Sequence, residues 1–341
     1  MKPFLSIIIP VYNAENYLNE CIEALLNQKF KDCEFIFIND GSTDKSINII
    51  KEYISRDSRI KLLNQKNKGV SEARNIGILN SSGRYITFVD ADDCIDKYIY
   101  EKVNQFLSKN NWDVLIYNIE EEIDGIKNII KYDFPSEKTF EEEYIKENII
   151  PIFIREDKLN SVCNKVYKKS FISSYKIKFP KGVALGEDCI FNINVFNQIS
   201  TCGYLNYTGY YYRETKNSAT RNINFNSDIK RALDIYKLDY NKIYNIKMEK
   251  EKLKKLKSIR LINTIKAYIY IIFKNNYNRK TTKNYVKKIL YNDNIQKALK
   301  VYKQNVRINS RYEKVMIYSI ERKLYFLLYM ICKYSIKRNS L

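Results

Sequence analysis

The sequence predicts an α/β fold built on a mostly parallel sheet with flanking helices, followed by a helical, basic C-terminal region. Over the first 118 residues, short continuous apolar runs alternate with stretches of helical spacing. Runs that are apolar at every position are typical of strands buried on both faces, and parallel strands need helices to connect them. From residue 229 onward the pattern is helical, rich in lysine and free of glycine and proline.

The individual elements follow from these patterns. We expect strands at residues 5–9, 34–38, 60–63, 85–89, 114–117 and 204–213, and helices at 17–26, 47–54, 70–77 and 186–199. The acidic stretches 120–122 and 141–143 are typical of a surface helix or loop. The order of these elements predicts three segments, which are residues 1–118, 119–225 and 226–341.

Composition narrows the chemistry that the chain supports. Apolar residues make up 45% and charged residues 29% of the 341 positions, as in a globular protein. Histidine is absent, so acid–base or metal chemistry must depend mainly on carboxylates. The seven scattered cysteines contain no CxxC pair, which favours reduced thiols over a disulfide framework or a zinc site.

The N-terminus leads directly into an apolar strand and carries no pattern of a secretory signal. The longest apolar runs, 267–273 and 324–332, are shorter than the roughly 20 residues that cross a bilayer. We therefore expect a cytoplasmic protein, either soluble or peripheral on the inner face of the cell membrane.

Positive charge is concentrated in the last third of the chain. Residues 229–341 hold 29 Lys+Arg against 7 Asp+Glu, whereas residues 1–228 hold 30 against 32. A basic excess of this size points to an anionic partner, which is a membrane surface, a polyanionic glycan or a nucleic acid.

Two places in the basic region combine charge with apolar residues. A dense basic run at 250–257 precedes Ile259, Ile262, Ile265 and Ile269, and Arg322-Lys323 precedes the apolar stretch 324–331. A basic amphipathic helix is attracted to anionic lipid by both burial and charge. The alternative is a helical appendage whose apolar stripe packs on the preceding domain.

Candidate site residues follow three of the predicted strands. Tyr12 follows the first strand, Asp40 follows the second, and the acidic run 90–93 follows the fourth. In an open parallel sheet these ends lie at one edge, where ligands bind. An aromatic ring can stack on a base, and a cluster of carboxylates suits a hard divalent cation that bridges phosphates.

Each of these features also has a purely structural interpretation. Asp40-Gly41-Ser42 fits a turn followed by a helix cap, the acidic run fits a solvated loop, and Tyr12 fits ordinary packing. Their joint placement at three strand ends favours a site for a nucleoside diphosphate and a cation.

The same residues resemble the family 2 glycosyltransferases of the GT-A fold, including those that build bacterial surface polysaccharides. The resemblance covers residues 4–95 strongly, extends more weakly to three later motifs, and leaves out the basic region. The matching motifs are Pro10–Asn13, Ile38–Asp44, Asn67–Gly77 and Val89–Asp93, with the weaker Asn164–Tyr167, Gly186–Asp188 and Tyr211–Arg213.

The resemblance implies a role for each matching position at a UDP-sugar site. Pro10 and Tyr12 would belong to the donor-binding residues, with Tyr12 stacking on the uracil ring, and Asp40 and Arg74 would contact the base. Asp90 would hold the ribose or a metal-bound water. Asp92 would bind Mn²⁺ or Mg²⁺ and, through it, the diphosphate.

The resemblance makes Asp188 the general base of the inverting members. An acid in the first turn of a helix also has a simpler explanation, which is its attraction to the helix dipole. Some relatives add a histidine to the metal, and this chain has none, so Arg213 is expected to clamp the diphosphate. Lys165 fits either a contact to phosphate or acceptor or a structural role.

These observations favour an inverting transferase that moves a sugar from a UDP-sugar to a hydroxyl of a glycan or lipid-linked acceptor. A sugar nucleotidyltransferase is the first alternative, but such enzymes place a Gly-rich loop where this chain has Pro10–Asn13. A basic nucleic-acid-binding or membrane-binding protein without catalysis is the second. Because the acidic strand ends would repel phosphates without a metal, we expect no nucleic acid as a partner.

Overall fold

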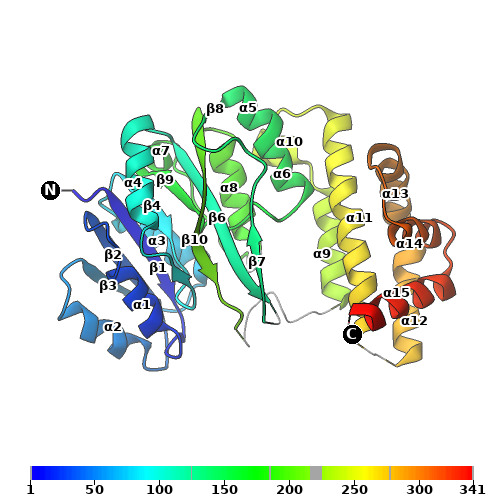
Figure 1. The fold of residues 1–341 in the computed structure, drawn as a ribbon, viewed down its shortest axis with the longest axis horizontal. Helices are drawn as coiled ribbons and strands as arrows, with labels where there is room; N and C mark the ends of the chain where they lie inside the picture. The colour runs from blue at the N-terminus through cyan, green and yellow to red at the C-terminus, as the bar shows by residue number, and fades with distance from the viewer. Residues whose placement is uncertain (1, 124, 184–185, 216–224, 276–277, 340–341) are drawn as a thin grey trace. The chain divides into compact units, whose positions relative to one another are not determined.

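The computed structural model describes residues 2–123, 125–183, 186–215, 225–275 and 278–339 (Figure 1). The chain divides into two compact units. The first comprises Met1–Phe153 and Asp157–Arg221, and the second comprises Ile154–Glu156 and Asn222–Leu341. The first unit is an α/β domain, and the second consists of helices in its described part.

One ten-stranded sheet forms the centre of the first unit. Its main path has the order β3-β2-β1-β4-β9-β6-β10-β5, with β7 and β8 paired to β6 and β10. The strands are β1 (Leu5–Val11), β2 (Cys33–Asp40), β3 (Ile60–Gln65), β4 (Tyr85–Phe88), β5 (Cys94–Ile95), β6 (Val114–Ile123), β7 (Ile126–Ile130), β8 (Thr139–Glu141), β9 (Lys165–Lys168) and β10 (Thr201–Tyr212).

Strand direction decides where the strand ends gather. β1 pairs in parallel with β2 and β4, and β2 pairs in parallel with β3. β9 runs antiparallel to both β4 and β6, so β6 and its parallel partner β10 run in the same direction as β1. Six strands therefore present their carboxyl ends at one edge of the sheet, where the candidate residues lie.

Helices flank this sheet, and several of them bury one apolar face. In α1 (Leu18–Leu26) the buried residues Leu18, Cys21, Ile22 and Leu25 have the spacing of one helical face. The other helices and turns of this unit are α2 (Ser46–Ile54), α3 (Val70–Asn80), α4 (Ile99–Asn110), α5 (Glu142–Tyr144), the π-helical turn η1 (Ile145–Ile149), α6 (Ile150–Arg155), α7 (Lys169–Ser174) and α8 (Glu187–Phe196).

The predicted α/β fold on a mostly parallel sheet is confirmed, and so is each predicted strand and helix of this unit. The prediction of a helix or loop for the acidic stretch 120–122 was wrong, because these residues continue strand β6. Here β6 pairs with β7 in a hairpin whose side chains are mostly exposed, so glutamates are tolerated in extended backbone.

The second unit has its own aliphatic core around the long helix α11 (Lys250–Lys274). Side-chain caps fix where three of its helices begin. Asn278, Asn292 and Ser310 each accept a hydrogen bond from a backbone N–H of the following first turn. The other helices are α9 (Phe225–Lys237), α10 (Tyr240–Tyr244), α12 (Arg279–Leu290), α13 (Asp293–Asn305), α14 (Arg311–Glu321) and α15 (Tyr325–Asn339).

The isoleucine stripe of α11 packs inside this unit. Ile262, Ile265 and Ile269 are fully buried in a cluster formed by α9 and α11–α15. The stripe is therefore satisfied within its own unit, which corrects both interpretations offered from the sequence, lipid contact and packing on the preceding domain. No helix in the described ranges combines the length and the apolar character needed to cross a lipid bilayer.

Candidate active site

The ends of β1 and β2 are tied together by Asn13. Its backbone N–H donates to Ser42 Oγ at 3.1 Å, and its side-chain Oδ1 accepts from the Thr43 N–H at 2.8 Å. Asn13 adopts a left-handed backbone with a φ of 50°, which asparagine tolerates better than most residues. These hydrogen bonds hold the chain in place where β1 ends. Tyr12 is 54% exposed there, whereas Pro10, two residues earlier, is partly buried.

Asp40, at the end of β2, holds the start of α3. Its Oδ1 accepts from Gln65 Nε2 at 2.6 Å and from the Lys68 N–H at 2.8 Å, and its Oδ2 accepts from the Gly69 N–H at 2.8 Å. Gly41 beside it has a φ of 76° and lies against the backbone of Asn67, where a Cβ would clash. A carboxylate has about four acceptor sites, so Asp40 keeps capacity for a further donor.

A buried tyrosine organises the acidic run after β4. Tyr210 Oη, from β10, donates to Asp93 Oδ2 at 2.5 Å and accepts from the Asp90 N–H at 3.1 Å. The Arg213 N–H donates to Asp93 Oδ1 at 2.8 Å. Burial, followed by the charges of Asp90 and Asp92, raises the pKa of Asp93 well above its usual range. Asp93 therefore anchors the run and leaves Asp90 and Asp92 at its surface.

Asp92 is suited to act as a ligand of a divalent cation. Burial and the nearby charge of Asp90 raise the pKa of Asp92 to about 6, although Arg213 and a hydrogen bond from Thr215 oppose this. A divalent cation would relieve that crowding, and its preferred ligands are oxygens. Within the described residues, no three His, Cys, Asp or Glu side chains are grouped to hold a metal. Asp92 would thus share a cation with phosphate oxygens and water, as Mg²⁺ sites often do.

Arg74, on α3, joins the two sides of the site. Its Nη2 donates to Asp90 Oδ1 at 2.9 Å, and its Nη1 donates to Asp188 Oδ1 at 2.6 Å and to Glu187 Oε1 at 3.3 Å. The guanidinium also lies over the Phe179 ring, 5.3 Å from its centroid. Burial lowers the pKa of Arg74, but the carboxylates outweigh it and raise that pKa well above its usual value.

Asp188 lies in the first turn of α8 and is held from two directions. Besides Arg74, its Oδ2 accepts from the Val162 N–H at 3.2 Å. Burial raises the pKa of Asp188, Arg74 lowers it, and Asp90 raises it, with a net upward shift. A fixed carboxylate with a raised pKa has the properties of a general base.

Lys165 holds the loop that supplies this Val162 N–H. Its buried Nζ donates to Leu159 O at 2.8 Å, Ser161 O at 2.5 Å and Asn164 Oδ1 at 3.0 Å. Burial lowers the pKa of Lys165 to about 7. The three hydrogen bonds of the Lys165 ammonium group all go to oxygens of this protein. They favour a structural role for Lys165 over a contact to phosphate or acceptor.

Arg213 follows β10 and lies beside the acidic run. Its guanidinium pairs with Glu20 of α1, donates to Cys94 Sγ at 3.2 Å and lies over the Tyr17 ring. About a third of the side chain is exposed. It is therefore held by surface partners that a phosphate could replace.

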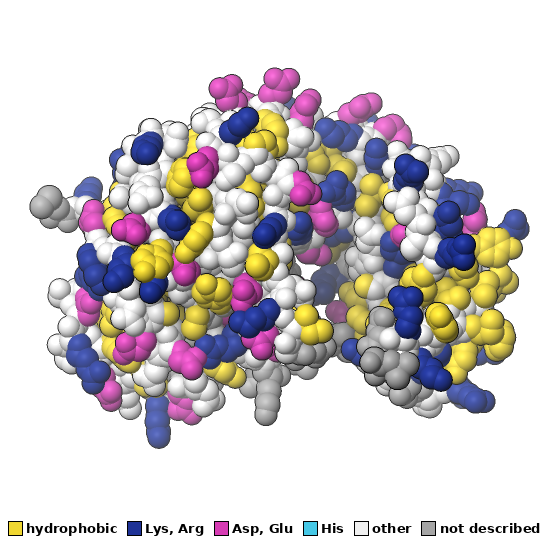
Figure 2. Space-filling model, in the orientation of Figure 1, with side chains coloured by type: hydrophobic (Ala, Val, Ile, Leu, Met, Phe, Trp, Pro, Cys, Tyr) yellow, Lys and Arg dark blue, Asp and Glu magenta, His cyan; other side chains and the backbone are white. Residues whose placement is uncertain are grey.

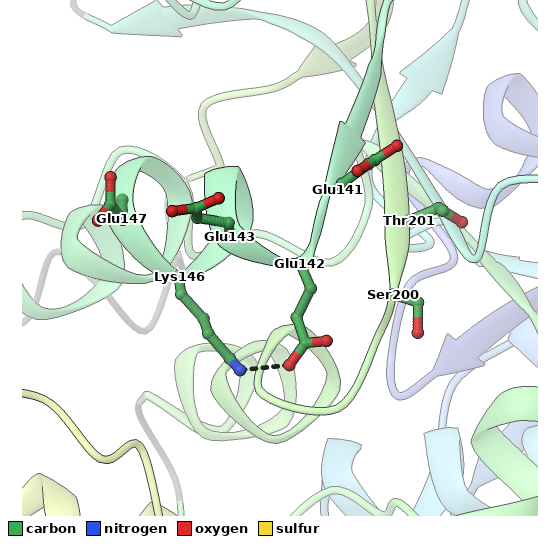
Figure 3. A pocket seen from close by; sticks show the side chains of 7 residues that line it. All are labelled: Glu141, Glu142, Glu143, Lys146, Glu147, Ser200 and Thr201. Atoms are coloured by element: carbon green, nitrogen blue, oxygen red, sulfur yellow. Dashed lines mark hydrogen bonds and ion pairs between the residues drawn. The ribbon is translucent and has the colours of Figure 1, made fainter.

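A surface hollow lies at the end of β10 that is opposite to the candidate site (Figure 3). Thr201 begins that strand, whereas Arg213 follows its other end. The four glutamates around the hollow are exposed, and Lys146 pairs with Glu142 one helical turn away. The hollow is thus separate from the candidate site. Its lining residues are Glu141, Glu142, Glu143, Lys146, Glu147, Ser200 and Thr201.

The structure brings three of the predicted site residues, Arg74, Asp90 and Asp188, into direct contact. Asp92 and Arg213 lie close to Asp90. Tyr12 and Asp40 lie at the ends of the neighbouring strands β1 and β2. Neither Asp93 nor Tyr210 was predicted from the sequence to have a role of its own. The position of Asp93 within the acidic run 90–93 could have indicated that it belongs to the site. No such signal marked Tyr210, because it is one of several tyrosines in the same strand.

A parallel sheet with an aromatic, acidic and cationic edge defines this unit as a GT-A-type α/β domain. Residues 6–174 match the family model described as "Glycosyl transferase family 2". The chain therefore carries a family 2 glycosyltransferase domain.

Three comparisons extend this result. The chain is similar to the uncharacterized glycosyltransferase EpsJ of Bacillus subtilis, with 30% identity over 64% of either chain. It is also similar to the minor teichoic acid biosynthesis protein GgaB of the same organism, with 33% identity over 61% of this chain and 23% of GgaB. It thus spans less than two thirds of each relative.

The third comparison is structural. The fold is similar to that of Staphylococcus aureus TarS 1-349 in complex with UDP-GlcNAc, with a TM-score of 0.65 and 18% identity. That similarity covers 99% of this chain and 92% of the other.

Proposed function

We propose that this protein is an inverting glycosyltransferase that transfers a sugar from a UDP-sugar to an acceptor hydroxyl. The observation that carries the proposal is the ion cluster of Arg74, Asp90 and Asp188. It links the strand end expected to bind the donor to a partly buried carboxylate able to accept the acceptor's proton. In this proposal residues 1–118 form the donor half and residues 119–225 the acceptor half of one shared sheet.

On the donor side, Tyr12 stacks on the uracil ring above Pro10, Asp40 accepts from the base, and Asp90 holds the ribose. The 54% exposure of Tyr12 supports its role, because a ring must be accessible to stack on a base. The UDP-GlcNAc complex of TarS supports UDP as the nucleotide. Because the Arg74 guanidinium already contacts three carboxylates, we propose that it positions Asp90 and Asp188 rather than binding the base as its main role.

At the diphosphate, Asp92 would hold Mn²⁺ or Mg²⁺, with Asp90 beside it. The cation, when bound, stabilises negative charge on the departing diphosphate. Tyr210 and the Arg213 N–H keep the acidic run in position through Asp93. The Arg213 guanidinium exchanges Glu20 for a phosphate oxygen, since its planar fork fits phosphate well.

On the acceptor side, Asp188 removes the proton of the attacking hydroxyl. The new bond forms between that oxygen and the anomeric carbon, while the bond from this carbon to the diphosphate breaks. A single displacement of this kind inverts the anomeric centre. The raised pKa of Asp188 makes it a stronger base than an exposed aspartate.

We further propose that the acceptor is a cell-surface glycan or its lipid-linked precursor. The support is the similarity to GgaB, which is named for minor teichoic acid biosynthesis.

The proposal is tested by a screen of UDP- and GDP-sugars with Mn²⁺, in which release of the free nucleotide is measured. We expect UDP release from one or a few UDP-sugars, loss of release with a chelator, and recovery when Mn²⁺ or Mg²⁺ is restored. Asp92→Ala should abolish release. The matched control is Asp32→Ala, an exposed aspartate before β2 at the opposite edge of the sheet, and it should keep the wild-type rate.

Three results would contradict the proposal. The first is a folded protein that leaves every donor intact. The second is full activity in the presence of chelator, and the third is equal loss of activity in both aspartate variants.

A further inference from the structure

Helix α15 presents a ridge of large apolar side chains to solvent. Phe326, Met330 and Tyr334 are 69%, 47% and 70% exposed, and their spacing of four residues places them on one face. Leu328 and Cys332, on another face of the same helix, are fully buried in the core of the second unit. The helix is therefore fixed in orientation by its buried face, and the ridge is left facing outward.

Cations surround this ridge, and acids are absent from the sequence around it. No Asp or Glu follows Glu321 in the chain. Lys323 also lies over the exposed ring of Tyr291, 4.6 Å from its centroid, which extends the apolar surface to the end of α12. Figure 2 shows yellow hydrophobic side chains gathered among dark blue cationic ones over the C-terminal helices. The basic residues are Arg322, Lys323, Lys333, Lys337 and Arg338.

The basic run of α11 differs from this surface. Lys250 and Lys255 are exposed, but most apolar residues of their helix are buried. α11 therefore offers charge alone, whereas α15 offers charge together with accessible aromatic and aliphatic area. Surfaces of this second kind lie in the headgroup region of a bilayer, with rings at the interface and lysines at the phosphates.

We propose that the α15 ridge of Phe326, Met330 and Tyr334 docks on an anionic lipid surface. The apolar side chains enter the boundary between headgroups and acyl chains, and the flanking cations contact lipid phosphates. Charge complementarity selects this partner, because each basic residue near such a surface strengthens binding by roughly fivefold. The inference is independent of the proposed transferase activity, since it concerns a surface in the other unit.

The test is flotation of the full chain with phosphatidylcholine vesicles, with and without phosphatidylglycerol, at low and high salt. We expect binding to the anionic vesicles only, weakened by salt. A variant carrying Phe326→Ser, Met330→Ser and Tyr334→Ser should bind at least about tenfold more weakly, because it removes the buried apolar area. Its circular dichroism and its affinity for UDP should stay unchanged.

A matched pair of variants separates this face from general charge. Lys337→Ser with Arg338→Ser removes two cations beside the ridge, and Lys250→Ser with Lys255→Ser removes two from α11. We expect a loss of about tenfold or more for the first pair and less than about threefold for the second.

Four results would overturn the proposal. They are no binding to anionic vesicles at low salt, equal binding to neutral vesicles, equal losses for the two lysine and arginine pairs, and unchanged binding by the triple serine variant. Light scattering adds a fifth, which is a wild-type dimer that the triple serine variant converts to monomer, because the ridge would then be an interface between copies of the chain.

Discussion

The two units of this protein bury different kinds of residue. The first unit buries charged groups at and near the sheet edge, including Asp40, Arg74, Asp93 and Lys165. In the described part of the second unit, the buried polar residues are Ser258, Thr282 and Ser319, and none of them carries a charge. Its many lysines lie at the surface or are partly exposed.

The difference indicates where each unit's function lies. Burying a charge is costly unless partners compensate for it, so a cluster of buried charges indicates groups held in place for chemistry. An aliphatic core with a charged surface has no such cluster. The exposed ridge of α15 is the part of the second unit for which we propose a binding role.

The largest effect on stability is expected where the buried charges meet. Arg74→Met should destabilise the first unit by about 3 to 5 kcal/mol, because three carboxylates would lose their shared partner. Arg213→Met, at a site about a third exposed, should cost no more than about 1 kcal/mol. Urea unfolding measures both values, and similar losses for the two variants would remove the distinction between buried and surface cations.

The second unit should respond most to loss of apolar volume. Ile265→Ala leaves a cavity in its core and should cost about 2 to 4 kcal/mol, while leaving the affinity for UDP unchanged. Leu79→Ala, at an 80% exposed leucine of α3, is the control and should change stability by less than about 0.5 kcal/mol. If Ile265→Ala lowered the affinity for UDP, the two units would not be functionally separable.

A smaller effect should appear as a dependence of stability on pH. Burial raises the pKa of Glu34, but hydrogen bonds from Lys61, Ser6 and Ser82 outweigh it and lower the pKa to about 2. Because the folded pKa lies below the unfolded value, this stabilisation is present above about pH 4.5 and is lost as the pH falls toward 2.

The matched variant is Glu34→Gln, which should cost roughly 1 to 3 kcal/mol at pH 7. It should also make the free energy of unfolding depend less on pH between 4.5 and 2. Wild-type and variant curves with the same slope between pH 4.5 and 2 would show that Glu34 does not carry this dependence.

The smallest effect is expected for an exposed ion pair. Lys303 Nζ lies 2.7 Å from Glu321 Oε1, and both side chains are more than a third exposed. Lys303→Ala should therefore cost only about 0.2 to 1 kcal/mol, less still at high salt. A cost of several kcal/mol in thermal unfolding would show that surface charge, and not the aliphatic core, stabilises this unit.

Much of the first unit could be predicted because its signals are local. Apolar runs marked the strands that run parallel to β1, but the short antiparallel strand β9, which lies between β4 and β6, was not predicted. The common direction of the predicted strands brought Tyr12, Asp40 and Asp90 to one edge. Which side chains meet across the site is a long-range property. The contact between Arg74 and Asp188 joins residues 114 positions apart, and no spacing in the sequence reveals it.

The basic region shows the limit of periodicity. The spacing of Ile262, Ile265 and Ile269 correctly indicates a helix with one apolar face. It does not say what covers that face, because lipid, another domain and a local helical core all satisfy the same pattern. The apolar stretch 324–331 was singled out from the sequence, but which of its side chains face outward was not, since it contains both the buried Leu328 and the exposed Phe326.

The most direct test of the active-site account compares Asp188→Asn with Glu187→Gln. Both variants remove a carboxylate that contacts Arg74, so both perturb the same ion cluster. We expect each to bind UDP within about twofold of wild type, while Asp188→Asn alone lowers the transfer rate by about 10² to 10⁴. Equal transfer rates for the two variants would contradict the assignment of Asp188 as the base and, with it, the mechanism proposed for this site.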